Sequence, residues 1–159
     1  MEKEYEYSMK VKDIKPFINY CKKNNYNLIN KTTQKRVLYR NDNKILARVT
    51  TIQEDKSKNI FLDFKDENES DDTLKISRES GKIDVTGKMN FVNAVLSMLG
   101  FDFYKELDRV RYVYTKDKVI FEIDEYLKPE MKVVGIEGNK EEVDKIYKVL
   151  ENEIKKWKC

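Results

Sequence analysis

Charged side chains recur at every second position in four segments of the chain, and their chemistry is the first indication of function. The four pairs are Glu4 and Glu6, Asp63 and Lys65, Arg109 and Arg111, and Glu122 and Asp124. Residues two apart in a β-strand point to the same face. Carboxylates are ligands for Mg²⁺ or Mn²⁺, and lysine and arginine bind phosphate oxygens. Brought together, these side chains could bind a divalent metal ion and a polyanion.

The composition excludes several kinds of catalytic site. The 159 residues contain no histidine, which rules out serine–histidine and cysteine–histidine triads and histidine-ligated zinc. The two cysteines, Cys21 and Cys159, lack the spacing of a metal site or a disulfide framework, and we expect Cys21 to pack in the core. Any chemistry must therefore use carboxylates, lysine, arginine and tyrosine.

The charge balance limits the partners. The 32 lysine and arginine residues and the 29 aspartate and glutamate residues give a net charge of +3, which is too balanced to indicate nucleic-acid binding. Charged residues still make up 38% of the chain, above the ~25% of an average domain, so some of them can line a polar interior. Signal-peptide patterns and bilayer-length apolar runs are absent. We expect one cytoplasmic domain over residues 1–159, without nucleic-acid or membrane partners.

The charged pairs fall on predicted β-strands whose opposite faces are apolar. In residues 2–11, Glu4 and Glu6 alternate with Tyr5 and Tyr7, a pattern typical of a strand with one apolar face. Further strands are predicted from "QKRVLYR", "KILARVTTI", "NIFLDFKD", "TLKISRESGKIDV", "LDRVRYVYTKDKVIFEIDEY" and "MKVVGIEG". These segments give about eight strands in total. We interpret the acidic "ENESDD" segment as a solvated loop.

Three predicted helices interrupt the strands. The first follows Asp13 in "DIKPFINYCKKNN", and the second covers about 89–99 and ends at Gly100. The third opens with Asn139 and Glu142 in the spacing of a capping box. Each helix carries an apolar stripe, which indicates packing against the apolar face of the strands. The order of elements lacks the βαβ alternation of a parallel sheet.

These patterns predict an α+β fold: a closed, eight-stranded antiparallel β-barrel with a polar interior and helices packed outside. A barrel of eight strands is wide enough to hold one small ligand. The pattern alone leaves a plainer interpretation open, in which the charged faces are solvated. Arg109 and Arg111 would then pair with Glu122 and Asp124 across a hairpin as ordinary opposite charges.

Several short motifs occur in an order that matches a known family over nearly the whole chain. They are "EYEYSMKVKDI", a strand led by Gln34, "FLDFK", a strand with Arg78, "LGF", "RVRYVY", "VIFEIDEY" and "GIEG" before a helix. In this order they resemble the CYTH family of triphosphate tunnel proteins, which includes class IV adenylate cyclases, thiamine triphosphatases and inorganic triphosphatases. The resemblance implies an antiparallel tunnel in which glutamates hold Mg²⁺ or Mn²⁺ and basic residues clasp a triphosphate.

The resemblance also implies roles for individual residues. The family signature Glu-x-Glu-x-Lys falls on Glu4, Glu6 and Ser8, and Lys10 on the same face partly replaces the missing lysine. Glu4 and Glu6 are the implied catalytic residues, with Glu4 the candidate base for an attacking water. The implied metal ligands are Glu4, Glu6, Asp124 and Glu137. The implied triphosphate-binding residues are Lys10, Arg48, Lys65, Arg78, Arg109 and Arg111.

The chain lacks other family residues as well, because Ser80, Lys82 and Gly135 stand where acids are usual. One metal ion can still be held, but a second is harder to bind. We therefore consider three functions: a metal-dependent phosphohydrolase for an inorganic or organic triphosphate, a class IV adenylate cyclase making cyclic AMP from ATP, and an impaired tunnel that binds polyphosphate or nucleotide without turnover. The organic part of the substrate, and whether the protein is a monomer or a homodimer, do not follow from the sequence.

Overall fold

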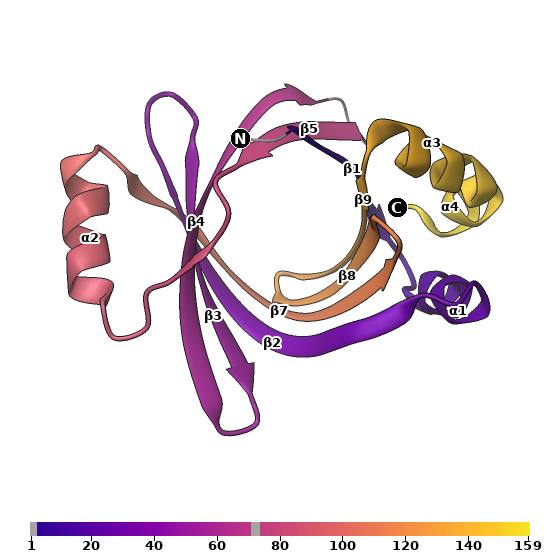
Figure 1. The fold of residues 1–159 in the computed structure, drawn as a ribbon, viewed down its shortest axis with the longest axis horizontal. Coiled ribbons are helices and arrows are strands. Elements are labelled where there is room, and N and C mark those ends of the chain that lie inside the picture. Colours follow the sequence, from indigo (N-terminus) through magenta and orange to yellow (C-terminus); the bar gives the residue numbers. More distant parts are fainter. Residues whose placement is uncertain (1–2, 71–73) are drawn as a thin grey trace.

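The computed structural model describes residues 3–70 and 74–159, and a ring of antiparallel strands dominates it (Figure 1). The strands of the ring are β1 (Lys3–Val11), β2 (Asn27–Arg40), β3 (Leu46–Glu54), β4 (Ser57–Ser70), β5 (Leu74–Glu79), β7 (Asp102–Lys116), β8 (Val119–Lys128) and β9 (Glu130–Gly138). Their hydrogen-bonded order is β3-β2-β7-β8-β9-β1-β5-β4, and β3 also pairs with β4. That last pairing closes the ring, so the predicted eight-stranded antiparallel barrel is confirmed.

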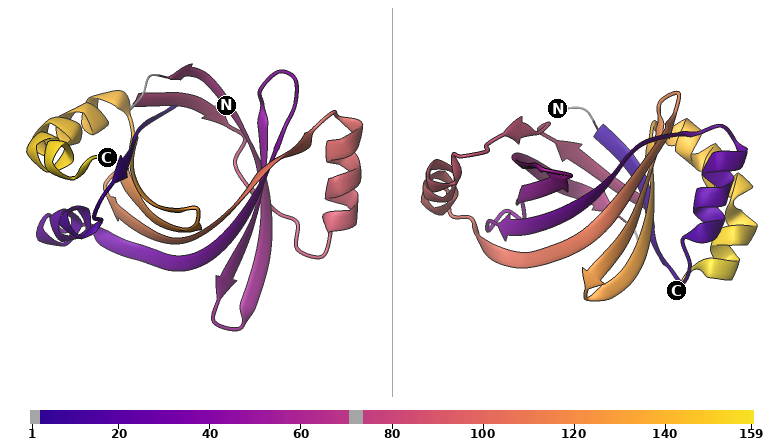
Figure 2. Two further views of the ribbon diagram at one scale, coloured as in Figure 1. Left: turned by 180° about the vertical axis from the view of Figure 1, so that it is seen from behind. Right: turned by 90° about the horizontal axis from the view of Figure 1, so that it is seen from below.

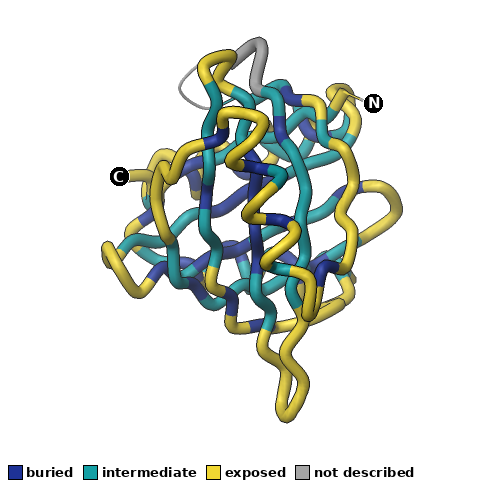
Figure 3. Tube along the Cα trace, turned by 90° about the vertical axis from the view of Figure 1, so that its left-hand side faces the viewer, coloured by how far each residue is buried: buried dark blue, intermediate teal, exposed yellow. Residues whose placement is uncertain are grey.

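Each strand of the ring has one face toward the barrel interior and one toward the outside. In β1, Glu6 lines the interior, whereas Tyr5 and Tyr7 pack against the hydrophobic core outside the ring. The core therefore lies between the ring and the helices. Burial follows this arrangement, since the middle parts of the strands are mostly buried or partly buried and many exposed residues lie in loops, in helices and at strand ends (Figure 3).

Helices cover the ring on two opposite sides (Figures 1 and 2). On one side are α1 (Lys15–Lys23), α3 (Lys140–Val149) and α4 (Glu151–Trp157), which bury Phe17, Cys21, Val143 and Ile154 against strand residues such as Ile136. On the other side, α2 (Met89–Met98) packs Val92 and Leu96 in a smaller cluster. None of the helices in the described ranges has the length and hydrophobicity that a membrane span requires.

Three differences from the sequence prediction change the number or type of an element. The predicted last helix is two helices, α3 and α4, which meet at Leu150; its predicted cap is confirmed, because Asn139 Oδ1 accepts a hydrogen bond from the Glu142 amide at 2.9 Å. The strand predicted from "TLKISRESGKIDV" is divided into β5 and the short β6 (Ile83–Asp84), which also pairs with β4. Residues 67–70 of the predicted acidic loop belong to β4, and residues 71 and 72 lie outside the described residues.

Candidate functional site

The ring encloses a cavity of about 1120 Å³, open to solvent and lined by side chains from all eight strands. We call this cavity the tunnel. Among the described residues, its lining contains ten lysine or arginine side chains and seven carboxylates. The charged faces of the strands therefore point inward, as the sequence predicts, and basic groups outnumber acidic ones. An interior of this kind favours an anionic ligand.

One group of charges lies on the neighbouring strands β7 and β8. Arg111 is opposite Asp124 in the register of these strands, and its Nε and Nη2 donate to the two carboxylate oxygens at 2.7 and 2.8 Å. Its Nη1 donates to Glu122. Burial alone would raise the pKa of Asp124, but the hydrogen bonds and charge of Arg111 outweigh burial and lower it. This carboxylate is therefore ionised and fully engaged by arginine.

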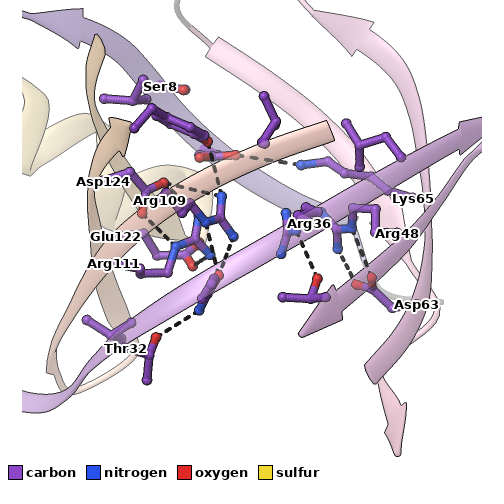
Figure 4. Close-up of a pocket in the computed structure, with 18 of the residues that line it drawn as sticks. Ser8, Thr32, Arg36, Arg48, Asp63, Lys65, Arg109, Arg111, Glu122 and Asp124 are labelled. Atoms are coloured by element: carbon purple, nitrogen blue, oxygen red, sulfur yellow. Dashed lines mark hydrogen bonds and ion pairs between the residues drawn. The ribbon is translucent and has the colours of Figure 1, made fainter. Parts of the chain in front are cut away.

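Arg109 is held just as firmly beside this pair (Figure 4). It is 2% exposed, and its Nε and Nη2 donate to Gln34 Oε1 at 3.0 and 2.8 Å. Its Nη1 donates to the Tyr126 hydroxyl at 3.1 Å and lies 3.5 Å from Asp124 Oδ2. Gln34 is itself fixed, because its amide donates to Thr32 Oγ1 at 2.9 Å. The guanidinium planes of this wall are thus oriented by protein groups.

A second group of charges lies on β3, β4 and β5. Arg48 Nε donates to Asp63 Oδ1 at 3.0 Å, its Nη2 also contacts Asp63, and Glu79 lies 3.1 Å away. Lys65 Nζ lies 3.5 Å from Glu79 Oε1 and 3.7 Å from Glu6 Oε2. Arg48 and Lys65 thus share Glu79, and Lys65 also reaches the acidic side of the tunnel.

Arg36 lies between these two groups and differs from the other tunnel arginines (Figure 4). Its Nε donates to Thr50 Oγ1 at 3.0 Å, and within the described chain it forms no ion pair with a carboxylate. Burial, followed by the charges of Arg109, Arg48 and Arg111, lowers its pKa well below the usual value. Arg36 is therefore a cation surrounded by cations, a position that an incoming anion would neutralise.

Carboxylates gather on β1 and β9, which lie between β8 and β5 in the ring. Glu6 and Glu137 are register partners in the β1–β9 pair. Burial, with the charges of Glu122, Glu6, Glu4 and Glu79, raises the pKa of Glu137 to about 9. Burial and the charge of Glu79 raise the pKa of Glu4 to about 7. These carboxylates lack sufficient positive charge around them, which is the electrostatic condition that a bound cation would relieve.

The carboxylates fit a divalent metal ion only in part. In residues 3–70 and 74–159, no group of three or more cysteine or carboxylate side chains is close enough to hold a metal ion together. Glu6 and Glu137 could supply two ligands, because they lie opposite each other on adjacent strands. Mg²⁺ commonly binds through one or two carboxylates, with water and substrate phosphates completing its octahedron. Glu6 and Glu137 therefore fit an ion that is also bound by substrate phosphates better than an ion held by the protein alone.

The structure brings most of the sequence-predicted site residues together. The tunnel lining includes Glu6, Lys10, Arg48, Lys65, Arg109, Arg111, Asp124 and Glu137, and Glu4 is half-buried beside Glu79. Arg78 is the exception: its side chain is 44% exposed and pairs with Asp66 at 2.7 Å on the outside of the ring. The reason is the two-residue alternation of β5, which places Glu79 in the tunnel and Arg78 on the other face.

The positions that depart from the family pattern also have definite places. Ser8 and Lys82 line the tunnel, and Lys82 Nζ lies 4.5 Å from the centroid of the Phe61 ring. Ser80 Oγ accepts a hydrogen bond from the Phe64 amide at 2.9 Å. A Cβ atom at Gly135 would lie 2.6 Å from Glu6 Oε1. Glu6 therefore occupies the space that a side chain at position 135 would need.

Sequence reasoning assigned no role to several tunnel residues, of which the most informative are Arg36 and Glu79. Alternation gives both of them, because Arg36 is two residues after Gln34 on the same face and Glu79 is two residues after the buried Ser77. Asp63 and Glu122, which the sequence marks as charged strand positions, also line the tunnel, and each binds an arginine of the neighbouring strand.

Comparison with known proteins identifies the fold. The sequence matches no protein-family model and no curated protein. Among solved structures, the PH1012 protein of Pyrococcus horikoshii OT3 is similar with a TM-score of 0.75 and 19% identity, covering 93% of this chain and 88% of that one. The Mediator head module of Schizosaccharomyces pombe is similar with a TM-score of 0.68 and 12% identity, covering 95% of this chain and 96% of that one.

A third similar structure is HpAC1 from Hippeastrum, an adenylyl cyclase-like protein described as having a dominant triphosphatase activity. It aligns with a TM-score of 0.63 and 14% identity, covering 98% of this chain and 90% of that one. At these identities the likeness shows a shared fold alone. The same fold thus occurs in a triphosphatase and in the Mediator head module, so function must be argued from the residues inside the tunnel.

Proposed function

We propose that the protein binds the triphosphate group of a small molecule in the tunnel and hydrolyses it. The observation that carries this proposal is Arg36, a tunnel cation without a carboxylate partner in the described chain, placed between the Arg109 and Arg111 pair and Arg48. A triphosphate spreads several negative charges over a short length and so suits a row of cations. The fold shared with HpAC1, described as a triphosphatase, supports the same class of ligand.

The basic residues would bind and orient the phosphates. Arg48, Arg109 and Arg111 already hold fixed orientations through Asp63, Gln34 and Asp124, so little ordering entropy is lost when a ligand binds. Arg36 would supply unneutralised charge, and the lysines at the rim, including Lys10, would add further contacts. Phosphoryl transfer depends mainly on such positioning and charge stabilisation.

Glu6 and Glu137 are the residues that would hold Mg²⁺ or Mn²⁺. The bound ion would neutralise phosphate charge and help to align the substrate. Asp124, which the family resemblance includes among the ligands, has both oxygens engaged by Arg111, and we assign it the role of fixing that arginine. Glu4 remains the candidate base, because it is half-buried on the same strand as Glu6 and a carboxylate of raised pKa can accept a proton from water near neutrality.

A second candidate function is ligand binding without turnover. Two observations favour it: Ser8 stands in the tunnel where the family carries a lysine, and Glu6 fills the space beside Gly135, where the family carries another acid. The first change removes a cation from the reacting end and the second removes a metal ligand. Either change can reduce a rate by a few powers of ten while binding persists.

The test is an assay of the purified protein with tripolyphosphate, thiamine triphosphate and ATP, each with Mg²⁺ and with Mn²⁺, following phosphate, pyrophosphate and cyclic AMP. If the protein is a hydrolase, phosphate is released and Glu6→Gln abolishes the release. Glu106→Gln, on the exposed outer face, leaves the rate of release unchanged. Thermal stabilisation by these compounds without any product identifies the binding function. Pyrophosphate with cyclic AMP identifies a cyclase, and neither product nor stabilisation refutes the proposal.

A further inference from the structure

Exposed apolar side chains concentrate around α2, away from the tunnel. Phe91, Met98 and Leu99 lie on or directly after this helix, and Ile83 and Phe103 lie in the segments before and after it. All five are between 61% and 85% exposed. Isolated exposed apolar residues are ordinary, but a group of this size marks an interaction surface. We call these five residues, with Ala94 and Val95, the α2 face.

The sequence of α2 separates the buried side of the helix from the exposed one. Val92 and Leu96 are buried against the ring, and Phe91, Val95 and Met98 recur at helical spacing on a different side. Helix α2, "MNFVNAVLSM", contains no charged residue, although 38% of the whole chain is charged. Figure 3 shows this helix facing outward with much of its trace exposed. The exposed surface of α2 itself is thus free of charged side chains.

We propose that the α2 face is the interface of a homodimer in which two copies of α2 pack antiparallel. A two-fold axis requires a self-complementary surface, and an axis passing between Ala94 and Val95 meets this requirement, because Phe91 then lies against Met98 of the partner subunit. The small Ala94 near the axis permits a close helix approach. The absence of charge means that no like charges meet across the axis.

The size of the surface reaches the lower end of the range for specific dimers. A large apolar side chain presents on the order of 150–200 Å² when fully exposed, so the five exposed side chains offer roughly 600 Å². A standard specific interface buries ~800 Å² per partner. A cavity of about 370 Å³, lined by residues including Ile45, Leu99 and Phe101, opens at the C-terminal end of α2. In the antiparallel arrangement, the partner's Phe91 lies over this end, as an aromatic anchor of the interface.

The first test is the molar mass of the full chain in solution over a range of concentrations, by sedimentation equilibrium. We expect a dimer that dissociates on dilution, and a dissociation constant raised at least tenfold by Ala94→Asp and by Met98→Asp. The matched control is Asn93→Asp, which adds the same charge to the other flank of α2 and should leave the constant unchanged. A monomer at every concentration overturns the proposal, and so does a dimer that neither substitution weakens.

The second test locates the axis by disulfide formation. In a Cys159→Ser background, Ala94→Cys places one thiol of each subunit beside the proposed axis, and Cys21 is buried and does not interfere. We expect rapid covalent dimerisation under mild oxidation. Asn93→Cys, adjacent in sequence but turned away from the axis, should cross-link much more slowly. Equal rates for both variants would show that α2 does not pair in this way, even if both fold as the parent does.

Discussion

Glu6 and Glu137 face each other directly across the β1–β9 pair, with both side chains in the tunnel. Side chains at such positions have Cβ atoms about 4.5–5.5 Å apart, and like charges there are unfavourable. Burial, followed by the charges of Glu122 and Glu6, raises the pKa of Glu137 to about 9. We call Glu4, Glu6 and Glu137 the acidic wall. Their mutual repulsion destabilises the metal-free protein, and this loss of stability can be measured without any assay of activity.

Glu137→Gln should stabilise the metal-free protein at alkaline pH. An unfolded chain ionises Glu137 near the ordinary value of 4.5, whereas the folded protein retains the proton until about pH 9. Folding stability therefore falls as the pH rises through this interval. In EDTA, we expect the melting temperature of the variant to exceed that of the parent by about 5 °C near pH 8.5 and to equal it near pH 4.5, on the order of 2 kcal/mol at the higher pH. A lower melting temperature of the variant at both values would contradict the assignment.

Asp124→Asn should destabilise the protein strongly, with the opposite pH dependence. The pKa of Asp124 is lowered in the fold, so its contribution to stability is present above the ordinary carboxylate pKa and is lost as the pH falls. Removing one member of a buried ion pair costs about 3–5 kcal/mol. Denaturant unfolding near pH 7 measures this loss. Asp66→Asn is the matched control, because it breaks the exposed pair with Arg78 and should cost less than about 1 kcal/mol.

The sequence predicts the ring because alternation is a local property. In β1, the strict exchange of Glu4 and Glu6 with Tyr5 and Tyr7 determines which face is polar, and the structure has that arrangement. Arg78 lies on the opposite face from the one expected. A family resemblance places it in the tunnel, but the register of β5 gives that face to Glu79. One residue of error in a strand moves a side chain to the other face.

Partners on strands that are distant in sequence could not be predicted, because they depend on which strands are neighbours. The pairs of Arg111 with Glu122 and Asp124 could be predicted, because one hairpin joins their strands. Lys65 reaches both Glu79 and Glu6, and these come from β5 and β1. Arg109 contacts Gln34 only because β2 pairs with β7, a pairing between segments 75 positions apart in sequence. Local patterns carry no information about such pairings. These pairings also leave Arg36 without a carboxylate partner in the described chain, because the nearby carboxylates Asp63 and Asp124 bind Arg48 and Arg111.

Gly135→Ala should change the acidic wall without unfolding the protein. The added Cβ would lie 2.6 Å from Glu6 Oε1, and a flexible carboxylate can rotate away, so we expect a stability loss below about 1.5 kcal/mol. Displacement of Glu6 should weaken Mn²⁺ binding, which isothermal titration calorimetry measures, by about tenfold, equivalent to ~1.4 kcal/mol. Glu106→Gln, on the exposed outer face of the ring, is the control for a substitution that does not touch the tunnel. Unchanged Mn²⁺ affinity in Gly135→Ala would remove Glu6 from the metal site.

Arg36→Gln should abolish most anion binding while preserving the fold. Hydrogen bonds to charged groups contribute about 1.5–3 kcal/mol, so the dissociation constant for tripolyphosphate, measured by calorimetry, should rise about 10- to 100-fold. The variant should be at least as stable as the parent without ligand, because it removes a partly buried cation that Arg109, Arg48 and Arg111 repel. Loss of affinity with unchanged or higher stability distinguishes a binding role from a structural one.

Two substitutions of basic residues serve as matched controls for Arg36→Gln. Lys35→Gln removes a positive charge from the adjacent residue, whose side chain is 57% exposed and pairs with Glu106 outside the ring. Arg78→Gln removes an arginine from the outer face of β5. Because both charges are separated from the tunnel by the wall and screened by solvent, we expect either change to alter the dissociation constant less than about twofold, within ~0.4 kcal/mol. Equal losses in all three variants would mean that tripolyphosphate responds to overall charge and not to Arg36 in the tunnel.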